Sequence, residues 1–99
     1  MLKTLVWLGS SRNDVRHFPR NARQRAGYEL YLVQSGLQAS DWKPMPSIGA
    51  GVQEIRVRSE LEHRVFYVAK FEEAIYVIHA FEKKAEKRPD MIWSWPNRD

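Results

Sequence analysis

Apolar residues recur every three or four positions between Arg12 and Ser35, which is the spacing of one face of an amphipathic helix. Proline fits the first turn of a helix but breaks an interior turn, so Pro19 divides this stretch. The pattern therefore predicts a short helix ending at His17 or Phe18 and a longer one that Gly36 stops. The stripe consists of Val15, Phe18, Ala22, Ala26, Leu30 and Val33.

Three further segments have simple patterns. Residues 3–8 are rich in β-forming side chains and predict a first strand. Residues 37–51 contain prolines and glycines without a sustained period and predict a loop. Residues 74–81 are apolar at nearly every position, which is typical of a central strand covered on both sides.

Residues 52–59 and 63–71 alternate with period two, so they predict a hairpin with one apolar and one charged face. A three-residue connection, 60–62, would pair Ser59 with His63. That register places Val57 on Val65, Ile55 on Tyr67, Arg58 on Arg64 and Arg56 on Phe66.

These elements predict an α+β fold, with a four-stranded, mainly antiparallel sheet and two N-terminal helices packed on one face. The 99 residues suit one domain, 1–99. The absence of cysteine excludes disulfides and thiolate chemistry and makes the cytoplasm the expected compartment. The apolar start is too short for a membrane-spanning helix and lacks a signal-peptide cleavage pattern.

The chain carries 16 Lys and Arg against 12 Asp and Glu, a net charge of +4. This excess favours an anionic partner: nucleic acid, an acidic protein or, last in order, a membrane surface. The sequence has no phosphate-binding loop, metal-ligand motif or hydrolase motif, so we expect no cofactor and no metal. Charge must therefore carry the chemistry.

The charged hairpin face holds Arg56, Arg58 and Arg64 beside Phe66. Like charges across a hairpin are unfavourable unless an anion lies between them, and a phosphate is the natural candidate. Cations beside an aromatic ring are typical of single-stranded RNA binding, in which the ring stacks on a base. The competing interpretation is an ordinary solvated sheet face.

Several other residues have two interpretations. Glu54 is either a general base or an ion-pair partner of Arg56, and His79 either a core histidine sharing its face with Val77 or a proton-transfer group. His17 and His63 are interpreted as surface residues. The arginines at positions 12, 16, 20, 23 and 25 form either a solvated helix face or a contact with ribosomal RNA.

Residues 51–84 resemble the RelE/ParE toxin superfamily. The pieces "GVQEIR", "HRVFYV" and "HAFEKK" are most similar to its phage-derived, HigB-like branch. The likeness also includes Phe18-Pro19, Gly27, Gln34-Ser35-Gly36 and Trp42, and it covers residues 3 to about 88.

The resemblance implies a toxin that enters the ribosomal A site and cleaves mRNA without a metal, through attack of a 2′-hydroxyl on the adjacent phosphate. Carried over by position, it implies catalytic roles for Arg64, Lys83 and Arg56, to which we add His79. We also predict four RNA-binding residues. They are Arg58, Phe66, Lys84 and Lys87, of which the two lysines lie in the basic segment after the last strand. The tail departs from the family, because residues 85–99 have neither tyrosine nor histidine and offer only Trp93 and Trp95 instead; residues 89–99 read as a truncated or drifted ending.

The predicted function is therefore a ribosome-dependent mRNA endonuclease of a type II toxin–antitoxin pair. The alternatives are a ParE-like gyrase inhibitor without nuclease activity and a catalytically inactive, phage-derived nucleic-acid-binding relative. The resemblance implies a helix-turn-helix antitoxin encoded by an adjacent gene. An acidic antitoxin segment would be steered to Arg56, Arg58 and Arg64 if it covers the basic face. Oligomeric state and codon preference are not indicated by these residues.

Overall fold

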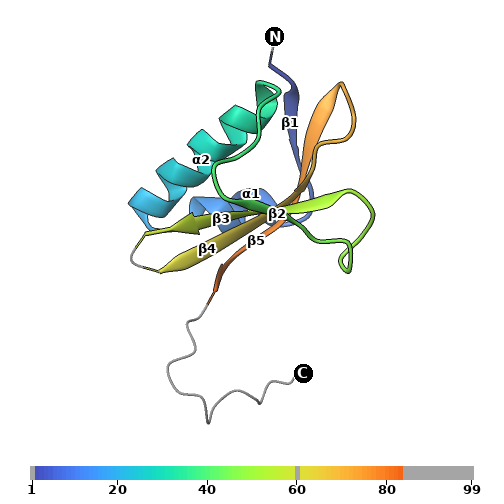
Figure 1. The fold of residues 1–99 in the computed structure, drawn as a ribbon. Helices are drawn as coiled ribbons and strands as arrows, with labels where there is room; N and C mark the ends of the chain where they lie inside the picture. Colours follow the sequence, from blue (N-terminus) through green and yellow to red (C-terminus); the bar gives the residue numbers. More distant parts are fainter. Residues whose placement is uncertain (1, 60, 84–99) are drawn as a thin grey trace.

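The helical pattern at the start of the chain forms two helices in the computed structural model, which describes residues 2–59 and 61–83 (Figure 1). Helix α1 spans Ser11–Arg16 and helix α2 spans Arg20–Gln34, so Pro19 separates them as predicted. Gly36, with φ of +88°, follows α2 in the left-handed region that ends helices.

In the described residues, five strands form one sheet, in the order β1-β5-β4-β3-β2. Strand β1 runs parallel to β5, and every other pair is antiparallel. The strands are β1 (Thr4–Trp7), β2 (Trp42–Pro44), β3 (Val52–Arg58), β4 (Glu62–Val68) and β5 (Ala74–Lys83). The predicted α+β class is confirmed, but the predicted number of four strands is wrong.

The additional strand is β2, within the segment predicted as a loop. It has only three residues and ends at Pro44, so it gives no alternation signal. It lies at the sheet edge, where proline is tolerated because one side of the strand needs no hydrogen-bond partner. Trp42 pairs with Ile55 and packs against the core.

The β3–β4 hairpin has a different register from the predicted one. Arg58 pairs with Glu62, not Arg64, so every partner is displaced by two residues. Because two is the period of a strand, the faces are as predicted even though the partners are not. The observed pairs include Val57 with His63, Arg56 with Arg64, Ile55 with Val65 and Glu54 with Phe66.

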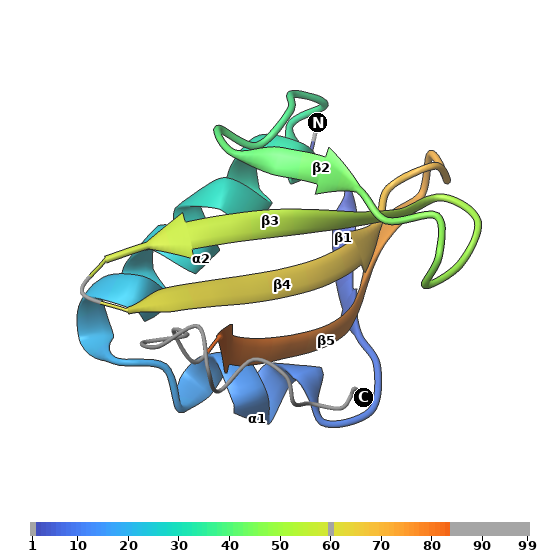
Figure 2. The ribbon, with the colours of Figure 1, turned by 60° about the horizontal axis from the view of Figure 1, so that its bottom comes forward.

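One face of the sheet is buried under the helices, and α2 lies behind the sheet in Figure 2. The small residues Ala22 and Ala26 let α2 approach closely, and both are fully buried. The core also contains Val15, Phe18, Leu30, Val33, Ile55, Val57, Val65, Tyr67, Ile75, Val77 and Ala80. The opposite face, turned towards the viewer in Figure 2, has no helix over it among the described residues.

Strand β5 contains a bulge that changes which side chains face the core. Tyr67 pairs with Val77, but Phe66 pairs with His79, so Ile78 is an extra residue. His79 therefore points away from the face that contains Val77, contrary to the prediction, and its side chain is 52% exposed. The expectation of a strand covered on both sides was also wrong, since only one face of β5 is fully buried in the described structure.

Candidate nucleic-acid interface

The helix-free side of the sheet carries three cross-strand rows of polar and aromatic side chains, nine residues that we call the outer face. Residues paired across strands point to the same side, so the register defines each row. The rows are Arg58–Glu62–Lys83, Arg56–Arg64–Phe81 and Glu54–Phe66–His79. Six residues of the predicted site are thus on one face: Arg56, Arg58, Arg64 and Phe66 on β3 and β4, and His79 and Lys83 on β5.

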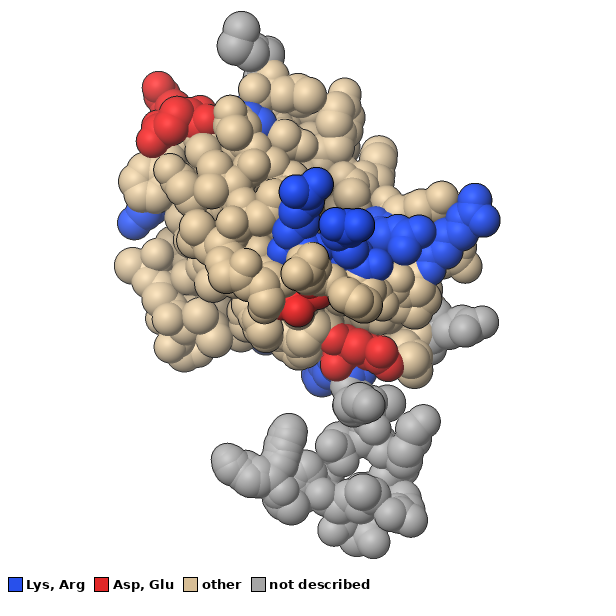
Figure 3. Space-filling model, turned by 180° about the vertical axis from the view of Figure 1, so that it is seen from behind, with Lys and Arg blue, Asp and Glu red and all other residues tan. Residues whose placement is uncertain are grey.

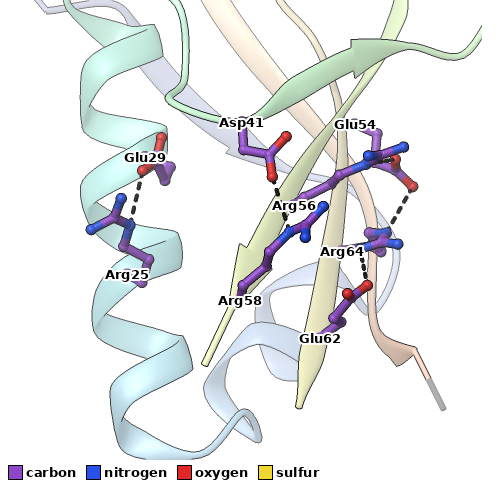
Figure 4. A network of polar contacts seen from close by, with 8 residues as sticks. All are labelled: Arg25, Glu29, Asp41, Glu54, Arg56, Arg58, Glu62 and Arg64. Carbon is purple, nitrogen blue, oxygen red and sulfur yellow. Dashed lines mark hydrogen bonds and ion pairs between the residues drawn. The ribbon is translucent and has the colours of Figure 1, made fainter. Parts of the chain in front are cut away.

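Arg64, the predicted principal catalytic cation, is at the centre of this face. Its Nε lies 3.3 Å from Glu54 Oε2, and its Nη1 donates a hydrogen bond of 2.9 Å to Glu62 Oε1 (Figure 4). Its side chain is only 6% exposed. The hydrogen bond from Arg64 lowers the pKa of Glu62 below its usual value. Arg64 is therefore fixed in one position by two carboxylates.

Glu54 resolves one of the alternatives left by the sequence. Its carboxylate also accepts a hydrogen bond of 3.2 Å from Arg56 Nε, so it bridges Arg56 and Arg64 across the two strands. Its side chain is 8% exposed. The ion-pair interpretation of Glu54 is the one that this geometry supports, because each of its two carboxylate oxygens already pairs with a guanidinium group.

Two more arginine–carboxylate pairs flank this centre in Figure 4. Arg58 Nε lies 3.2 Å from Asp41 Oδ2, in the connection before β2. Arg25 Nε on α2 lies 3.0 Å from Glu29 Oε2, and Glu29 Oε1 accepts the backbone N–H of Ser40. Each predicted hairpin cation thus already has a carboxylate partner in the protein.

Three aromatic rings lie beside the arginines on β4 and β5. The His79 and Phe81 rings stack at 5.6 Å between centroids, and Phe66 meets Phe81 edge-on at 5.5 Å. Phe81 is the direct cross-strand partner of Arg64. These rings offer a surface on which an unpaired base could stack next to the cations.

His79 also has a charged neighbour from α1. Its Nδ1 lies 3.6 Å from Asp14 Oδ2, and the same oxygen accepts a hydrogen bond of 2.9 Å from Ser10 Oγ. A carboxylate at Nδ1 favours the tautomer with the proton on that nitrogen and leaves Nε2 able to accept one. The half-exposed position of His79 fits the proton-transfer interpretation, and the core interpretation is wrong.

Other predicted residues are distributed as follows. Lys83 is exposed and pairs in register with Glu62, on the same face as Arg64. Lys84, Lys87, Trp93 and Trp95 lie outside the described residues. His17 is exposed, as predicted, whereas the surface interpretation of His63 is wrong, because its ring is fully buried against Phe18 at 4.4 Å.

Sequence analysis missed Asp14, Asp41, Glu62 and Phe81. A signal was available for Glu62, because its parity along β4 is that of Arg64 and Phe66. Phe81 was assigned to the core strand, and only the bulge turns it outward. Asp14 and Asp41 are distant in sequence from their partners, and no local pattern joins them.

The described residues contain no group of three or more His, Asp or Glu side chains that could hold a metal ion. Within the same part of the chain, neither helix has the length and apolar character needed to cross a bilayer. Charge, aromatic stacking and the His79–Asp14 pair are thus the chemical means that this face offers.

Comparison with known proteins agrees with this fold. The family described as "Phage derived protein Gp49-like (DUF891)" matches residues 13–92. A chain of the crystal structure of the toxin–antitoxin complex RelBE2 from Mycobacterium tuberculosis superposes with a TM-score of 0.54 at 17% identity, covering 84% of this chain and 100% of that chain. No curated protein matches the sequence.

The fold is thus similar to that of a chain of this complex, and together with the family match it confirms the resemblance noted in the sequence. The chain belongs to the phage-derived Gp49-like family.

Proposed function

We propose that this protein is the toxin of a toxin–antitoxin pair and that it cleaves mRNA on the ribosome at the outer face. The observation that carries the proposal is the middle row, Arg56–Arg64–Phe81, where two cations and a ring lie side by side. Cations for the phosphate and a ring for the base are what a strand of RNA requires. The family and the fold support the toxin class.

In the proposed reaction, the 2′-hydroxyl of one nucleotide loses its proton and its oxygen bonds to the adjacent phosphorus. The bond from phosphorus to the 5′-oxygen then breaks, and that oxygen takes up a proton. Arg64 and Lys83 stabilise the additional negative charge on the phosphorane, and Arg56 and Arg58 hold the backbone in line. His79, with Asp14 at its Nδ1, accepts or donates the proton through Nε2.

Because Glu54 and Glu62 hold Arg64 in place, its guanidinium needs little reorganisation when charge develops. We expect Arg64→Ala to reduce mRNA cleavage by about 10²- to 10³-fold, the usual effect of removing one donor from an oxyanion. The measurement is the rate of mRNA cleavage in a purified translation mixture.

Loss of Arg64 also leaves Glu54 partly unpaired, so folding must be measured separately by thermal unfolding. Lys83→Ala removes an exposed cation of the outer face without disturbing the ion pairs. This variant should cleave mRNA more slowly but unfold at the same temperature as the parent. If both variants fold and cleave as fast as the parent, the assignment of the outer face to catalysis is wrong.

One observation favours a second candidate, a toxin that binds without cleaving, such as a gyrase inhibitor or an inactive relative. Arg64 is almost completely buried, and two carboxylates compensate its charge, as in a structural ion-pair network. Expression in growing cells separates these candidates. mRNA breaks at codon boundaries support the nuclease, double-strand DNA breaks with intact mRNA support the gyrase inhibitor, and normal growth supports the inactive relative.

We also propose an antitoxin partner, a small helix-turn-helix protein that binds this toxin and represses their shared operon. The similarity in fold to a chain of a toxin–antitoxin complex supports this proposal. Copurification of the chain with the product of the adjacent gene tests it directly.

A further inference from the structure

The arginines of the outer face and its flank are balanced by carboxylates within the protein. Arg25 is matched by Glu29 and Arg58 by Asp41, while Glu54 and Glu62 together match Arg56 and Arg64. Four arginines thus stand against four carboxylates, which makes this network neutral overall. The net positive charge of the described residues must therefore come from side chains outside this network.

Four arginines on the helices are among the cations outside this network. Arg12 and Arg16 on α1 and Arg20 and Arg23 on α2 are all exposed. Within residues 2–59 and 61–83, none of the four has a carboxylate within 4.0 Å. Their charges are thus available to an external anion, unlike those of the hairpin arginines.

The four side chains form one continuous surface. Arg23 Nη1 lies 3.4 Å from the backbone oxygen of Arg16, so the end of α1 and the start of α2 are in contact. Figure 3 shows a band of basic side chains across the face on which these two helices lie. We call the set of Arg12, Arg16, Arg20 and Arg23 the helix arginine surface.

Repulsion between neighbouring arginines, and the arginines at the start of α2, are electrostatically unfavourable for these helices. Arg12 and Arg16 are four positions apart and Arg20 and Arg23 three apart, so like charges are neighbours on each helix. The first turn of α2 contains no acidic residue, and arginines there oppose the helix dipole. A bound polyanion would relieve both kinds of repulsion.

We propose that the helix arginine surface binds the phosphate backbone of a folded RNA, apart from the outer face where a single strand would be cleaved. The choice of RNA rests on the proposed function. Guanidinium groups contact phosphate oxygens with two parallel hydrogen bonds. The exposed residues next to these arginines in the sequence include Asn13, Asn21 and Gln24, which are polar donors and acceptors.

The same residues argue against the other polyanionic partners. A protein interface needs buried aromatic or aliphatic anchors, and a membrane surface needs bulky apolar side chains beside the cations. The exposed positions of α1 and of the first turn of α2 carry none. Backbone recognition without base contacts fits a double-helical stem, whose deep major groove hides the bases.

The test measures binding of a labelled RNA hairpin to the full chain by fluorescence anisotropy, over a series of salt concentrations. Arg16→Ala with Arg20→Ala should weaken binding at least tenfold. It should also lower the steepness of log Kd against log salt by about 2, roughly 0.9 for each lost phosphate contact. The matched control, Lys3→Ala with Lys70→Ala, removes two charges that line a groove elsewhere on the protein, and it should leave the slope unchanged.

Three outcomes would overturn the inference. The first is an unchanged salt slope for the double arginine variant, and the second is an equal loss of RNA affinity in the arginine and lysine variants. The third is that the arginine variant loses affinity only for anionic vesicles of phosphatidylglycerol, measured in parallel, and not for the RNA hairpin. Thermal unfolding of the variants shows whether they are folded. The double arginine variant should unfold at no lower temperature than the parent, because loss of like charges should not destabilise the helices. The proposed function fails separately. If RNA-hairpin binding depends on the arginines but no mRNA is cleaved, only the nuclease assignment is wrong. If mRNA is cleaved but RNA-hairpin binding does not depend on the arginines, only the assignment of the helix arginine surface is wrong.

Discussion

Tyr67 is a residue whose burial follows from the alternation along its strand, whereas the surroundings of its hydroxyl do not. It is fully buried in β4, and its hydroxyl has no hydrogen-bond partner in the described structure. Burial, and secondarily the nearby Glu29 carboxylate, raises the pKa of Tyr67 to about 12. The native protein therefore holds the phenol proton more strongly than the unfolded chain does.

A pH dependence of stability follows from this difference. Since the folded pKa is above the unfolded value of 10.0, the native state binds more protons between these two values, and stability must fall as pH rises from about 10 to about 12. Tyr67→Phe should remove this alkaline loss. It should also leave stability near pH 8 unchanged or slightly higher, because it deletes an unsatisfied hydroxyl.

Urea unfolding of the parent and of Tyr67→Phe at pH 8 and pH 11 measures this effect. Tyr31→Phe is the matched control, since Tyr31 is exposed on α2 and its removal should not change the alkaline loss. An equal loss of stability at pH 11 in the parent and in Tyr67→Phe would contradict the prediction.

The β3–β4 hairpin contains two carboxylates that pair with Arg64 in different surroundings. Glu54 is 8% exposed and bridges two arginines, whereas Glu62 is 40% exposed. Removing one partner from a buried pair leaves an uncompensated charge, so Glu54→Ala should destabilise the protein by about 3 kcal/mol. Glu62→Ala should cost much less than Glu54→Ala, as for an exposed pair.

Denaturant unfolding of the two alanine variants at neutral pH gives both values, and their difference is the informative quantity. Similar losses for Glu54→Ala and Glu62→Ala would mean that burial does not distinguish the two carboxylates. The hairpin would then be stabilised mainly by its apolar face.

The helices and the longer strands were predictable because their patterns are local. One apolar stripe interrupted by Pro19 produced α1 and α2, and period-two alternation produced β3 and β4. Strand β2 was not predictable, since three residues ending in proline carry no period. The hairpin register was missed because alternation fixes the faces but permits a shift of two residues.

Much of the candidate site was predictable as a set of residue types but not as an arrangement. The positions of Arg56, Arg64 and Phe66 on one face followed from alternation. The outward position of His79 depends on the bulge at Ile78, which no sequence pattern revealed. His63, by contrast, shares its parity with Val65 and Tyr67, so its burial could have been predicted from the same alternation that placed its neighbours.

At the scale of the whole molecule, the two sides of the protein differ in electrostatic character. The arginines of the outer face are compensated by carboxylates, while the helix arginine surface has cations without such partners in the described ranges. Long-range attraction of an acidic partner depends on uncompensated charge. The electrostatic attraction expected from the sequence at Arg56, Arg58 and Arg64 should therefore be weaker than their number suggests.

The ion pair of Asp41 and Arg58 allows the antitoxin's docking face to be tested, because substituting either partner should change the association rate in opposite directions. Both side chains are partly exposed, at 43% and 57%, and both are polar, so substitution should leave the core intact. If an acidic antitoxin segment covers the outer face, Asp41→Asn frees Arg58 and should speed association, while Arg58→Gln should slow it. The salt dependence should become steeper in the first variant and flatter in the second. Stopped-flow association with the purified antitoxin measures both, and unchanged rates in the two variants would mean that the antitoxin docks elsewhere, on the helices or at the exposed edge of β2.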